Sequence, residues 1–437
     1  MDLAPHMSGS RGPYVRAADL RDIAETLFAE LRAAGGAGAH DTLGVSRDSY
    51  GPGETAALAV IERAARAHAL TCHRDAAANL VVTLPGRAPE LPALACGSHL
   101  DSVPRGGNFD GAAGVVAGLL ALIAMRASGV TPRRSIHLYG LRGEESAAFG
   151  RAYIGSSALF GELGAEDLAL THATTGDTLA SRLADVGADL ARISRQEPLL
   201  DPRSLACWLE LHIEQGPVLL ARDLPLTAVT GIRGNVRHRS VLCEGEAGHS
   251  GAVPRWLRHD AVFAVADLLA RLDGHWQRLI AQGHDLVMTI GVIGTDPAEH
   301  AIARIPGKVA FSFEARSESE ATLEAVHALF LAECDRVGEE RGVRFTPGRR
   351  LDTRPAQLDP ALVERVRAAI RALGLPDEPI ASGAGHDAAV FAQAGVPSAM
   401  IFVRNAHGSH NPREAMTIDD FMLGAEVLRQ CLVEGAE

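Results

Sequence analysis

The sequence predicts an α/β protein whose larger domain holds a mixed, mainly parallel sheet flanked by helices, with a smaller α+β sandwich inserted into it. Short apolar runs alternate with helical segments in the first half of the chain, and a strand-rich region follows from about 224 to 351 before the first pattern returns. Buried strands that alternate with helices are typical of parallel sheets. At 437 residues the chain is also long enough for two compact domains.

The first half of the chain opens with two predicted helices. Residues 17–34 carry apolar positions at helical spacing and end in the glycine-rich GGAGAHD, which predicts a helix with a stop. A second helix is expected from Glu54 to His68. Apolar runs bounded by turn residues then predict buried strands at 79–86, 92–102 and 133–145, with an apolar helix at 111–128 among them.

The middle of the chain predicts a domain of its own. Its expected order is strand, strand, helix, strand, strand, helix, strand, over the segments 226–232, 235–248, 259–280, 284–293, 308–317, 320–341 and 343–351. The segments that follow, 361–374, 386–395 and 396–403, return to helix and strand alternation. We therefore expect a catalytic domain formed by 1–223 and 352–437, interrupted by an α+β sandwich at 224–351.

Charge and composition narrow the function classes. The formal charge of -12 argues against a nucleic-acid partner, because backbone binding relies on clustered Lys and Arg. No stretch approaches the roughly 20 apolar residues that span a bilayer, and MDLAPHMSGSRGPYVRAADL lacks an apolar signal-peptide core. We expect no membrane partner and a cytoplasmic location. The six cysteines lack CxxC spacing and predict reduced, mostly buried thiols.

Polar side chains gather where the apolar runs end. In open α/β sheets the ligand crevice lies beyond the carboxyl ends of the strands, so residues that follow different strands can converge. The segments concerned are GSHLDS at 97–102, NFDG at 108–111, GEES at 143–146, LHIEQG at 211–216 and GSHNP at 408–412. The sequence therefore predicts a site rich in histidine and carboxylate at this edge of the sheet.

Two of these segments also fit simpler interpretations. His99 and Asp101 flank one residue, so on an extended backbone both side chains point the same way, and Asp101 can hold one imidazole nitrogen while the other binds a metal. The same pattern also fits a capped surface histidine. Asp110 precedes the long apolar helix, so it could cap that helix, bridge two metals, or do both.

Glu144 and Glu145 are adjacent acids after a strand-like run, a costly placement unless cations compensate the charge. A surface acidic pair is the alternative, but the preceding run favours a buried strand end. One carboxylate could bind metal while its neighbour takes a proton from the attacking water. Histidines with carboxylates and no thiolate together describe a two-metal site suited to zinc, manganese, cobalt or nickel.

The motifs, taken in order, resemble a known family. GSHLDS, NFDGAAG, GEES, LHIEQGP, GEAGHSG, IPGKVAFSFEAR, SGAGHDA and GSHNP resemble the carbamoylase and allantoate amidohydrolase branch of the M20 metallopeptidases. That branch includes N-carbamoyl-L-amino-acid hydrolases, β-alanine synthase and allantoate amidohydrolase, and the resemblance spans about residues 20–430. It implies a Zn-exopeptidase-like catalytic domain and a ferredoxin-like inserted domain that acts as a lid and forms a homodimer.

The resemblance also implies two divalent metal ions per subunit, zinc first, with manganese, cobalt or nickel as alternatives. One ion would be held by His99, Asp110 and His212. The other would be held by Glu145 and His410, with Asp110 bridging the two ions. The peptidase branch carries an acidic residue at the position of His212, so this histidine favours the amidohydrolase branch.

The remaining implied roles concern catalysis and a small substrate that carries a carboxylate. Glu144 would be the general base, and Asp101 the hydrogen-bond partner of the first ligating histidine. His249 resembles a histidine that reaches the partner's active site across a dimer and stabilises the tetrahedral intermediate. Arg316 resembles the arginine that pairs with the substrate carboxylate, with a surface strand position as the alternative. The other implied substrate contacts are Gln215, Gly385 and His386.

The chain departs from the family at one substrate contact. Ala303 stands where family members often have asparagine, and Arg304 follows it, so the substrate identity is left open. We predict an amidohydrolase that cleaves the C–N bond of N-carbamoyl-L-amino acids or related ureido and allantoate-type compounds. The alternative in the family is a dipeptidase or aminoacylase. A non-catalytic binding protein conflicts with the intact set of ligand and base residues, and an oxidoreductase lacks support because no GxGxxG follows the first strand.

Overall fold

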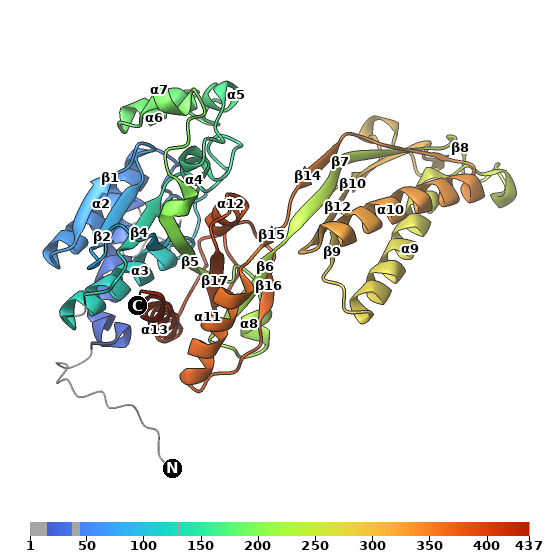
Figure 1. Ribbon diagram of the computed structural model, residues 1–437. Coiled ribbons are helices and arrows are strands. Elements are labelled where there is room, and N and C mark those ends of the chain that lie inside the picture. The colour runs from blue at the N-terminus through green and yellow to red at the C-terminus, as the bar shows by residue number, and fades with distance from the viewer. Residues whose placement is uncertain (1–14, 37–43, 130, 437) are drawn as a thin grey trace, which may run out of the picture. The chain divides into compact units, whose positions relative to one another are not determined.

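The chain folds as two compact units, shown in the computed structural model, which describes residues 15–36, 44–129 and 131–436 (Figure 1). The main unit consists of Met1–Thr230, Leu358–Ile380 and His386–Glu437. The inserted unit consists of Gly231–Gln357 and Ala381–Gly385. The boundaries predicted at 224 and 351 fall several residues before those of the structure, and the sequence does not predict the second piece of the inserted unit.

A mixed sheet forms the centre of the main unit. The strands of this sheet are β1 (Thr71–Arg74), β2 (Leu80–Leu84), β3 (Ala93–His99), β4 (Ile136–Leu141), β5 (Leu205–Ile213), β6 (Leu226–Ile232), β15 (Ala356–Gln357), β16 (Ile380–Ser382) and β17 (Ser398–Val403). Strand β15 and the last two residues of β6 and β16 belong to the inserted unit. The order is β1-β2-β4-β3-β5-β17-β6-β15, and β16 also pairs with β6. Strands β4, β3, β5 and β17 run parallel, whereas the pairs toward both edges are antiparallel. The predicted α/β class is confirmed.

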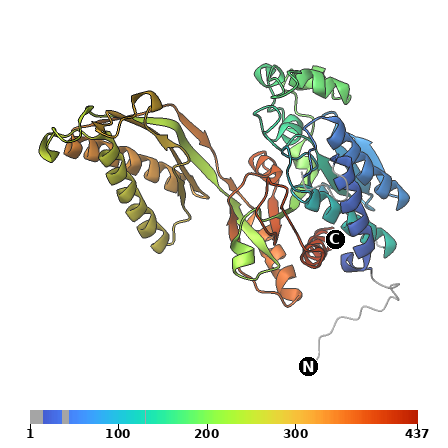
Figure 2. The same ribbon diagram turned by 180° about the vertical axis from the view of Figure 1, so that it is seen from behind.

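Helices pack against this sheet. Helix α3 (Ala112–Ala127) is apolar on all sides and buried along nearly its whole length, in contact with β3, β5 and α13 (Ile418–Gly435). Helices α1 (Arg21–Ala34) and α2 (Pro52–Ala67) lie side by side (Figure 2). Residues 37–41 of the predicted glycine-rich stop lie outside the described residues. The other helical elements are η1 (Ala17–Leu20), α4 (Ile154–Leu159), α5 (Ala165–Leu168), α6 (Leu179–Asp185), α7 (Leu190–Ile193), η2 (Pro202–Ser204), α8 (Val218–Ala221), α11 (Pro360–Ala372) and α12 (Asp387–Gln393).

The inserted unit has its own core. Strands β7 (Gly234–Glu244) and β12 (Lys308–Ser317) pair antiparallel, and helices α9 (Ala261–Ala281) and α10 (Glu320–Arg341) pack on them and on each other. The shorter elements are β8 (Gly248–His249), η3 (Arg255–Leu257), β9 (Val287–Thr289), β10 (Ile293–Gly294), η4 (Pro297–Glu299), β11 (Arg304–Ile305), β13 (Arg344–Pro347) and β14 (Arg350–Thr353). This arrangement confirms the predicted α+β sandwich.

The strand predicted at 226–232 forms, but the sequence assigns it to the wrong domain. The sequence predicts this run as the first strand of the inserted domain, but β6 pairs antiparallel with β17, through Ala228–Ile401 and Leu226–Val403. Most of its residues are buried, as expected for a strand inside a sheet covered on both faces. The chain therefore leaves the main unit at the end of this strand rather than before it.

Two predicted single strands of the inserted unit are divided. The run 284–293 forms β9 and β10, which pair with β12 on either side of its register shift between Phe311 and Phe313. The run 343–351 forms β13 and β14, because the chain leaves the ladder at Gly348 and Arg349. Sequence periodicity does not reveal such local interruptions of a strand.

Among the described residues, none of the helices combines the length and the apolar character needed to cross a bilayer. The cytoplasmic location stays a prediction. The six cysteines lie in the described ranges as free thiols, and all but the half-buried Cys72 are buried.

Candidate metal centre

The predicted ligands lie at the carboxyl edge of the main sheet. His99 ends β3, and His212 is the second-last residue of β5. Asp110 lies in the turn before α3, Glu145 follows β4, and His410 lies in the loop after β17. All five belong to the main unit.

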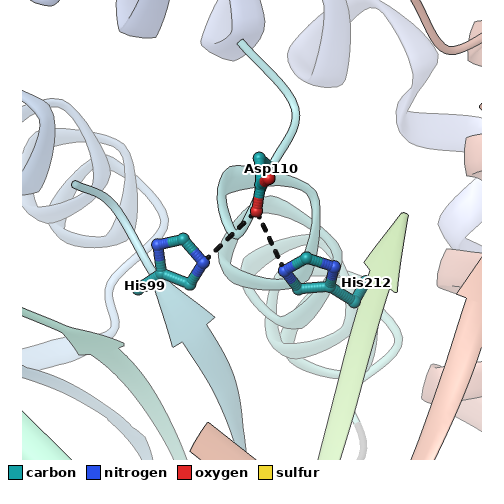
Figure 3. Close-up of side chains that lie close together, drawn as sticks. All are labelled: His99, Asp110 and His212. Carbon is teal, nitrogen blue, oxygen red and sulfur yellow. Dashed lines mark ion pairs between the residues drawn. The ribbon is translucent and has the colours of Figure 1, made fainter. Parts of the chain in front are cut away.

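His99, Asp110 and His212 form the first group of potential ligands. Both imidazoles point at the Asp110 carboxylate from opposite sides (Figure 3). The Nε2 atoms of His99 and His212 lie 3.4 Å and 3.2 Å from the same oxygen, Asp110 Oδ1. Nearly all of this group is shielded from solvent, since each residue is at most 3% exposed. One cation could therefore contact all three side chains at once.

Asp110, Glu145 and His410 form the second group. His410 Nε2 lies 3.4 Å from Asp110 Oδ2 and 3.1 Å from Glu145 Oε1. In both groups the potential ligand atoms lie within 4.8 Å of one another. Asp110 thus offers Oδ1 to the first group and Oδ2 to the second, which is the arrangement of a bridging carboxylate.

The backbone of the turn places Asp110 between the two groups. The N-cap of α3 is Gly111, which has a φ of +65°, and no side chain caps this helix within the described residues. A side chain at Gly111 would overlap the His99 ring, so the turn approaches that ring closely. The interpretation of Asp110 as a helix cap is therefore wrong.

The tautomers of the two buried histidines favour a cation between them and Asp110. His212 Nδ1 lies 2.9 Å from the Ile213 carbonyl oxygen, and His99 Nδ1 lies 3.2 Å from the Asp101 carbonyl oxygen. Donation to these oxygens leaves lone pairs on both Nε2 atoms. The Nε2 atom of His212 accepts the Gly111 N–H at 3.2 Å, and both Nε2 atoms lie near Asp110 Oδ1, a buried oxygen that has no hydrogen-bond partner among the described residues. The donor set of imidazole and carboxylate fits zinc and its neighbours in the first transition row.

The electrostatics of the centre point the same way. Burial opposes ionisation of Asp110, but hydrogen bonds donated by the rings of His212, His410 and His99 when they carry a proton outweigh it and hold the pKa of Asp110 well below its usual range. Hydrogen bonding to Asp110, and then to Glu145, raises the pKa of His410 to about 10. The carboxylates therefore favour positive charge at this position, and a metal ion would have to displace a proton from His410.

Glu144 lies next to the first group, with its Oε2 atom 3.9 Å from His99 Nε2. Burial raises the pKa of Glu144 well above the usual range, and the nearby His99 lowers it by less. The role of Glu144 as general base stays a prediction, and its position beside His99 is compatible with it.

Asp101 makes more contacts in the site than the sequence predicts. Its Oδ1 atom lies 3.3 Å from His99 Nδ1, the predicted pairing. The same carboxylate accepts the backbone N–H groups of Glu144 at 3.1 Å and Glu145 at 3.0 Å, and the Ser49 hydroxyl at 2.7 Å. One buried side chain thus aligns the histidine at the end of β3 with both acids after β4.

Two of the predicted substrate contacts lie at this centre. Gln215, with a φ of +62°, donates from Nε2 to Asp110 Oδ2 at 2.8 Å, so here its amide contacts a candidate ligand. The buried ring of His386 lies 4.5 Å from the ring of His212, and burial, with the His212 charge, holds the pKa of His386 well below its usual range. A neutral His386 can donate or accept a hydrogen bond without adding charge to the site.

A third group of potential ligands, Glu210, His212 and His386, overlaps the first. The Glu210 carboxylate already accepts the Ser98 hydroxyl at 2.7 Å, the Ala388 N–H at 2.8 Å and the Trp208 indole N–H at 3.2 Å. These three hydrogen bonds stabilise the buried carboxylate of Glu210 without a cation, so we interpret Glu210 as a structural residue.

His249, Arg316 and Gly385 belong to the inserted unit, and their part in this site stays a prediction. His249 is exposed and accepts the Gly251 N–H at Nδ1, at 3.2 Å. Arg316 donates from Nη1 to the Gly383 carbonyl at 2.9 Å and lies 3.1 Å from Glu314 Oε1. A substrate carboxylate would have to share or replace these partners of Arg316.

Several residues that support the centre are not predicted from the sequence. Arg47 is fully buried and donates to the Leu100 carbonyl and to Asn108 Oδ1, which ties the end of β3 to the Asp110 turn. Glu54 accepts the Gly143 N–H at 2.9 Å and pairs with Arg142, just before the two acids. In sequence, Glu54 looks like an ordinary acid in the first turn of a helix, so no local signal separates it from others.

Comparison with known proteins gives consistent matches over most of the chain. The model of peptidase family M20/M25/M40 matches residues 95–434. An N-carbamoyl-L-amino-acid amidohydrolase of Paenarthrobacter aurescens is 34% identical over 88% of this chain and 92% of its own. A ureidoglycolate hydrolase of Arabidopsis thaliana is 30% identical over 89% and 82%. A crystal structure of a hydantoinase/carbamoylase family amidase from Burkholderia multivorans superposes with a TM-score of 0.84 at 28% identity, covering 94% of this chain and 98% of that one.

Proposed function

The chain belongs to peptidase family M20/M25/M40, and from this membership we propose that it is a metal-dependent amidohydrolase acting on N-carbamoyl-L-amino acids or related ureido compounds. The family resemblance predicted from the motifs is confirmed. The chain is a hydrolase of C–N bonds, as are the relatives named for carbamoyl, allantoate and ureidoglycolate substrates. Which of these substrates it takes belongs to the proposal.

The observation that carries the proposal is the shared carboxylate of Asp110. One oxygen faces His99 and His212, and the other faces His410. We infer that His99, His212 and Oδ1 hold one divalent cation, and that Glu145, His410 and Oδ2 hold a second. Two such cations, when bound, polarise a scissile carbonyl and lower the pKa of the attacking water.

The protein's own residues then move the proton. Glu144 Oε2 accepts a proton from the attacking water as its oxygen bonds to the carbamoyl carbon. The same oxygen returns the proton to the nitrogen of the amino acid as the C–N bond breaks. The other product, carbamate, decomposes to ammonia and carbon dioxide, so one water is consumed for each substrate. Asp101 keeps Glu144 in place through the backbone N–H at 3.1 Å.

Recognition of the substrate is assigned to residues of both units. Arg316 would pair with the substrate carboxylate, where a planar guanidinium suits a two-point contact. His249 would stabilise the charged oxygen of the tetrahedral intermediate. Gln215, Gly385 and His386 would complete the pocket. Ala303 offers no side-chain amide, so the asparagine contact that the family resemblance implies would be missing in this chain.

We also infer that the chain forms a homodimer through the inserted unit. Trp256 is 80% exposed and Phe263 is 61% exposed, and Val292, Ile293 and Ile302 are exposed as well. Trp256 and Phe263 also line one surface hollow of this unit, and large exposed apolar side chains are typical of an interaction surface. The assignment of His249 to the partner's active site requires such a dimer.

A direct substrate comparison tests the proposal. Purified protein loaded with zinc, manganese or cobalt is assayed with an N-carbamoyl-L-amino acid, the matching N-acetyl amino acid and the matching dipeptide. We expect the carbamoyl compound to have the highest kcat/KM and chelation to abolish the activity. Preference for the dipeptide or the acetyl compound would instead identify a dipeptidase or aminoacylase on the same site.

A further inference from the structure

The loop after β17 carries His410 and doubles back on itself. Ala406 and Ala415 pair through two backbone hydrogen bonds, of 2.7 Å and 3.1 Å, which close the loop at its base. Within it, His407 and His410 have positive φ values of 66° and 60°, which non-glycine residues rarely adopt. A loop that holds such backbone geometry needs contacts outside itself to stay in place.

Glu414 supplies those contacts. Its side chain is 7% exposed, and its Oε1 atom accepts the N–H groups of Phe109 at 2.8 Å and Asp110 at 3.3 Å. Its Oε2 atom accepts the Ser409 hydroxyl at 2.9 Å. A side chain at Gly107 would overlap the Glu414 carboxylate, so the glycine leaves room for this close approach. One carboxylate thus binds the turn that carries Asp110 and the loop that carries His410.

Ser409 connects Glu414 directly to the bridging ligand. Its hydroxyl oxygen lies within hydrogen-bonding distance of both Glu414 Oε2 and Asp110 Oδ2. A hydroxyl has one proton, so Ser409 donates fully to one carboxylate at a time. When Ser409 donates to Glu414, the Gln215 amide remains the donor to Asp110 Oδ2, and a second lone pair of this oxygen is left for a cation.

We propose that Glu414 is a positioning residue that sets the geometry of the second cation site, by fixing the Asp110 turn and the Ser409–His410 loop against each other. The inference rests on the proposed function, because it assumes that Asp110, Glu145 and His410 hold a cation. Glu414 itself is not a ligand in this scheme, since its two oxygens are occupied by two backbone N–H groups and a hydroxyl. In other metal sites, mutation of a residue that orients a ligand in this way typically lowers metal affinity by about 10- to 100-fold.

The test uses cobalt, whose visible absorption reports coordination geometry. Apoprotein of the wild type and of Glu414→Ala, Glu414→Gln and Ser409→Ala is titrated with Co²⁺ by calorimetry and by absorption. Glu426→Ala is the matched control. Like Glu414, Glu426 is a buried carboxylate that accepts a backbone N–H, here from Ala17 at 2.9 Å. It lies on α13 and contacts none of the candidate ligands in its described hydrogen bonds. Thermal unfolding of each apoprotein measures the structural cost alone.

We expect Glu414→Ala to bind the second Co²⁺ about 10- to 100-fold more weakly, with a changed spectrum. Glu414→Gln keeps an oxygen for the Phe109 N–H, so its affinity should return to within about threefold of the wild type. Ser409→Ala should change the spectrum of the second ion, and it tests the same link if Glu414→Ala does not fold. Glu426→Ala should lower the unfolding temperature and leave cobalt binding unchanged.

Two results would overturn the proposal, and they are distinguishable. If the wild type binds two Co²⁺ ions and both Glu414→Ala and Ser409→Ala match its affinities and spectrum, Glu414 has no positioning role, although the proposed function stands. If the wild type itself binds no second Co²⁺ ion, the dinuclear site is wrong and the role of Glu414 falls with it.

Discussion

The main unit and the inserted unit hold their candidate functional side chains in opposite ways. In the main unit, His99, Asp110 and His212 are buried and each is hydrogen-bonded to a buried residue. His410 is the exposed member of the candidate ligand set. In the inserted unit, His249 is exposed and Arg316 is partly exposed, with contacts to a neighbouring carboxylate and a carbonyl. Chemistry at a metal centre requires fixed geometry, whereas recognition and association tolerate adjustable contacts. Substitutions of the candidate ligands or of Glu144 should therefore reduce cation binding or kcat, whereas substitutions of Arg316 or of the exposed apolar residues of the inserted unit should mainly reduce substrate affinity or dimerisation.

The largest effect is expected for Glu144→Gln. The amide occupies the same space but cannot take a proton from the attacking water, so kcat should fall by roughly 10²- to 10⁴-fold. The cation content, measured by elemental analysis, should stay at the wild-type value because Glu144 is not an assigned ligand. Retained turnover with full cation content would remove Glu144 from the role of general base.

An intermediate effect is expected for Arg316→Ala. Loss of the pairing with the substrate carboxylate should raise KM by about 10- to 100-fold, with a smaller change in kcat. The steady-state rate as a function of substrate concentration separates the two parameters.

Arg237 offers a matched control for Arg316. It lies on the neighbouring strand β7, opposite Glu314 in the ladder, and contacts the same carboxylate at 2.9 Å. Arg237→Ala should leave KM close to the wild-type value. Equal increases of KM in both variants would mean that Glu314, or the strand pair as a whole, is disturbed, and that Arg316 has no specific role in binding.

Comparison of the two units also explains how much the sequence predicts. The five candidate ligands could be proposed because they lie in short polar motifs near the ends of apolar runs, and because those motifs in order resemble a known family; the structure brings these side chains into two groups. Glu414 and Arg47 are missed because they act through hydrogen bonds to residues far away in the chain. The Phe109–Glu414 bond joins residues 305 positions apart, and the Arg47–Asn108 bond joins residues 61 apart. Such partners depend on the fold and leave no periodic pattern.

The same distinction holds for the fold. Helix α10 begins and ends at the predicted residues 320 and 341, because Ser319 caps its start and Gly342 ends it in a left-handed conformation. Strand β6 is assigned to the wrong unit because the run LTAVTGI is apolar in either setting. Its partner, β17, comes more than a hundred residues later in the sequence.

A smaller effect is expected for exposed apolar side chains of the inserted unit. Trp256→Ser and Phe263→Ser should each raise the dissociation constant of the homodimer by about 10- to 30-fold, because aromatic residues at the centre of an interface contribute most to binding. Leu220→Ser is the control from the main unit, since Leu220 is 51% exposed on α8. Sedimentation equilibrium over a range of protein concentrations measures the constant. A wild type that stays monomeric, or an equal effect of Leu220→Ser, would contradict an interface on the inserted unit.

The smallest effect concerns pH and a buried histidine pair in the inserted unit. The Nε2 atoms of His238 and His327 lie 3.0 Å apart, His238 Nδ1 lies 2.8 Å from the Gly348 carbonyl oxygen, and His327 Nδ1 lies 3.2 Å from Arg350 Nη1. Arg350 can only donate, so His327 accepts at Nδ1 and donates from Nε2 to His238, which in turn donates from Nδ1 to the carbonyl. Both rings are then neutral, and an added proton would place two N–H groups against each other.

Burial, followed by the charge of Arg350, holds the pKa of His327 below its usual value. In the unfolded chain His327 titrates near its ordinary pKa of about 6.5, so below that pH the unfolded state binds a proton that the folded state does not. The stabilisation is therefore present above about pH 6.5 and decreases as the pH falls through it. In His327→Gln the amide can accept from Arg350 and donate to His238 but cannot titrate. Between about pH 7.5 and about pH 5.5 the unfolding temperature of the wild type should drop by roughly 1–2 °C more than that of the variant. An equal drop in both proteins would show that this pair contributes nothing to the pH dependence.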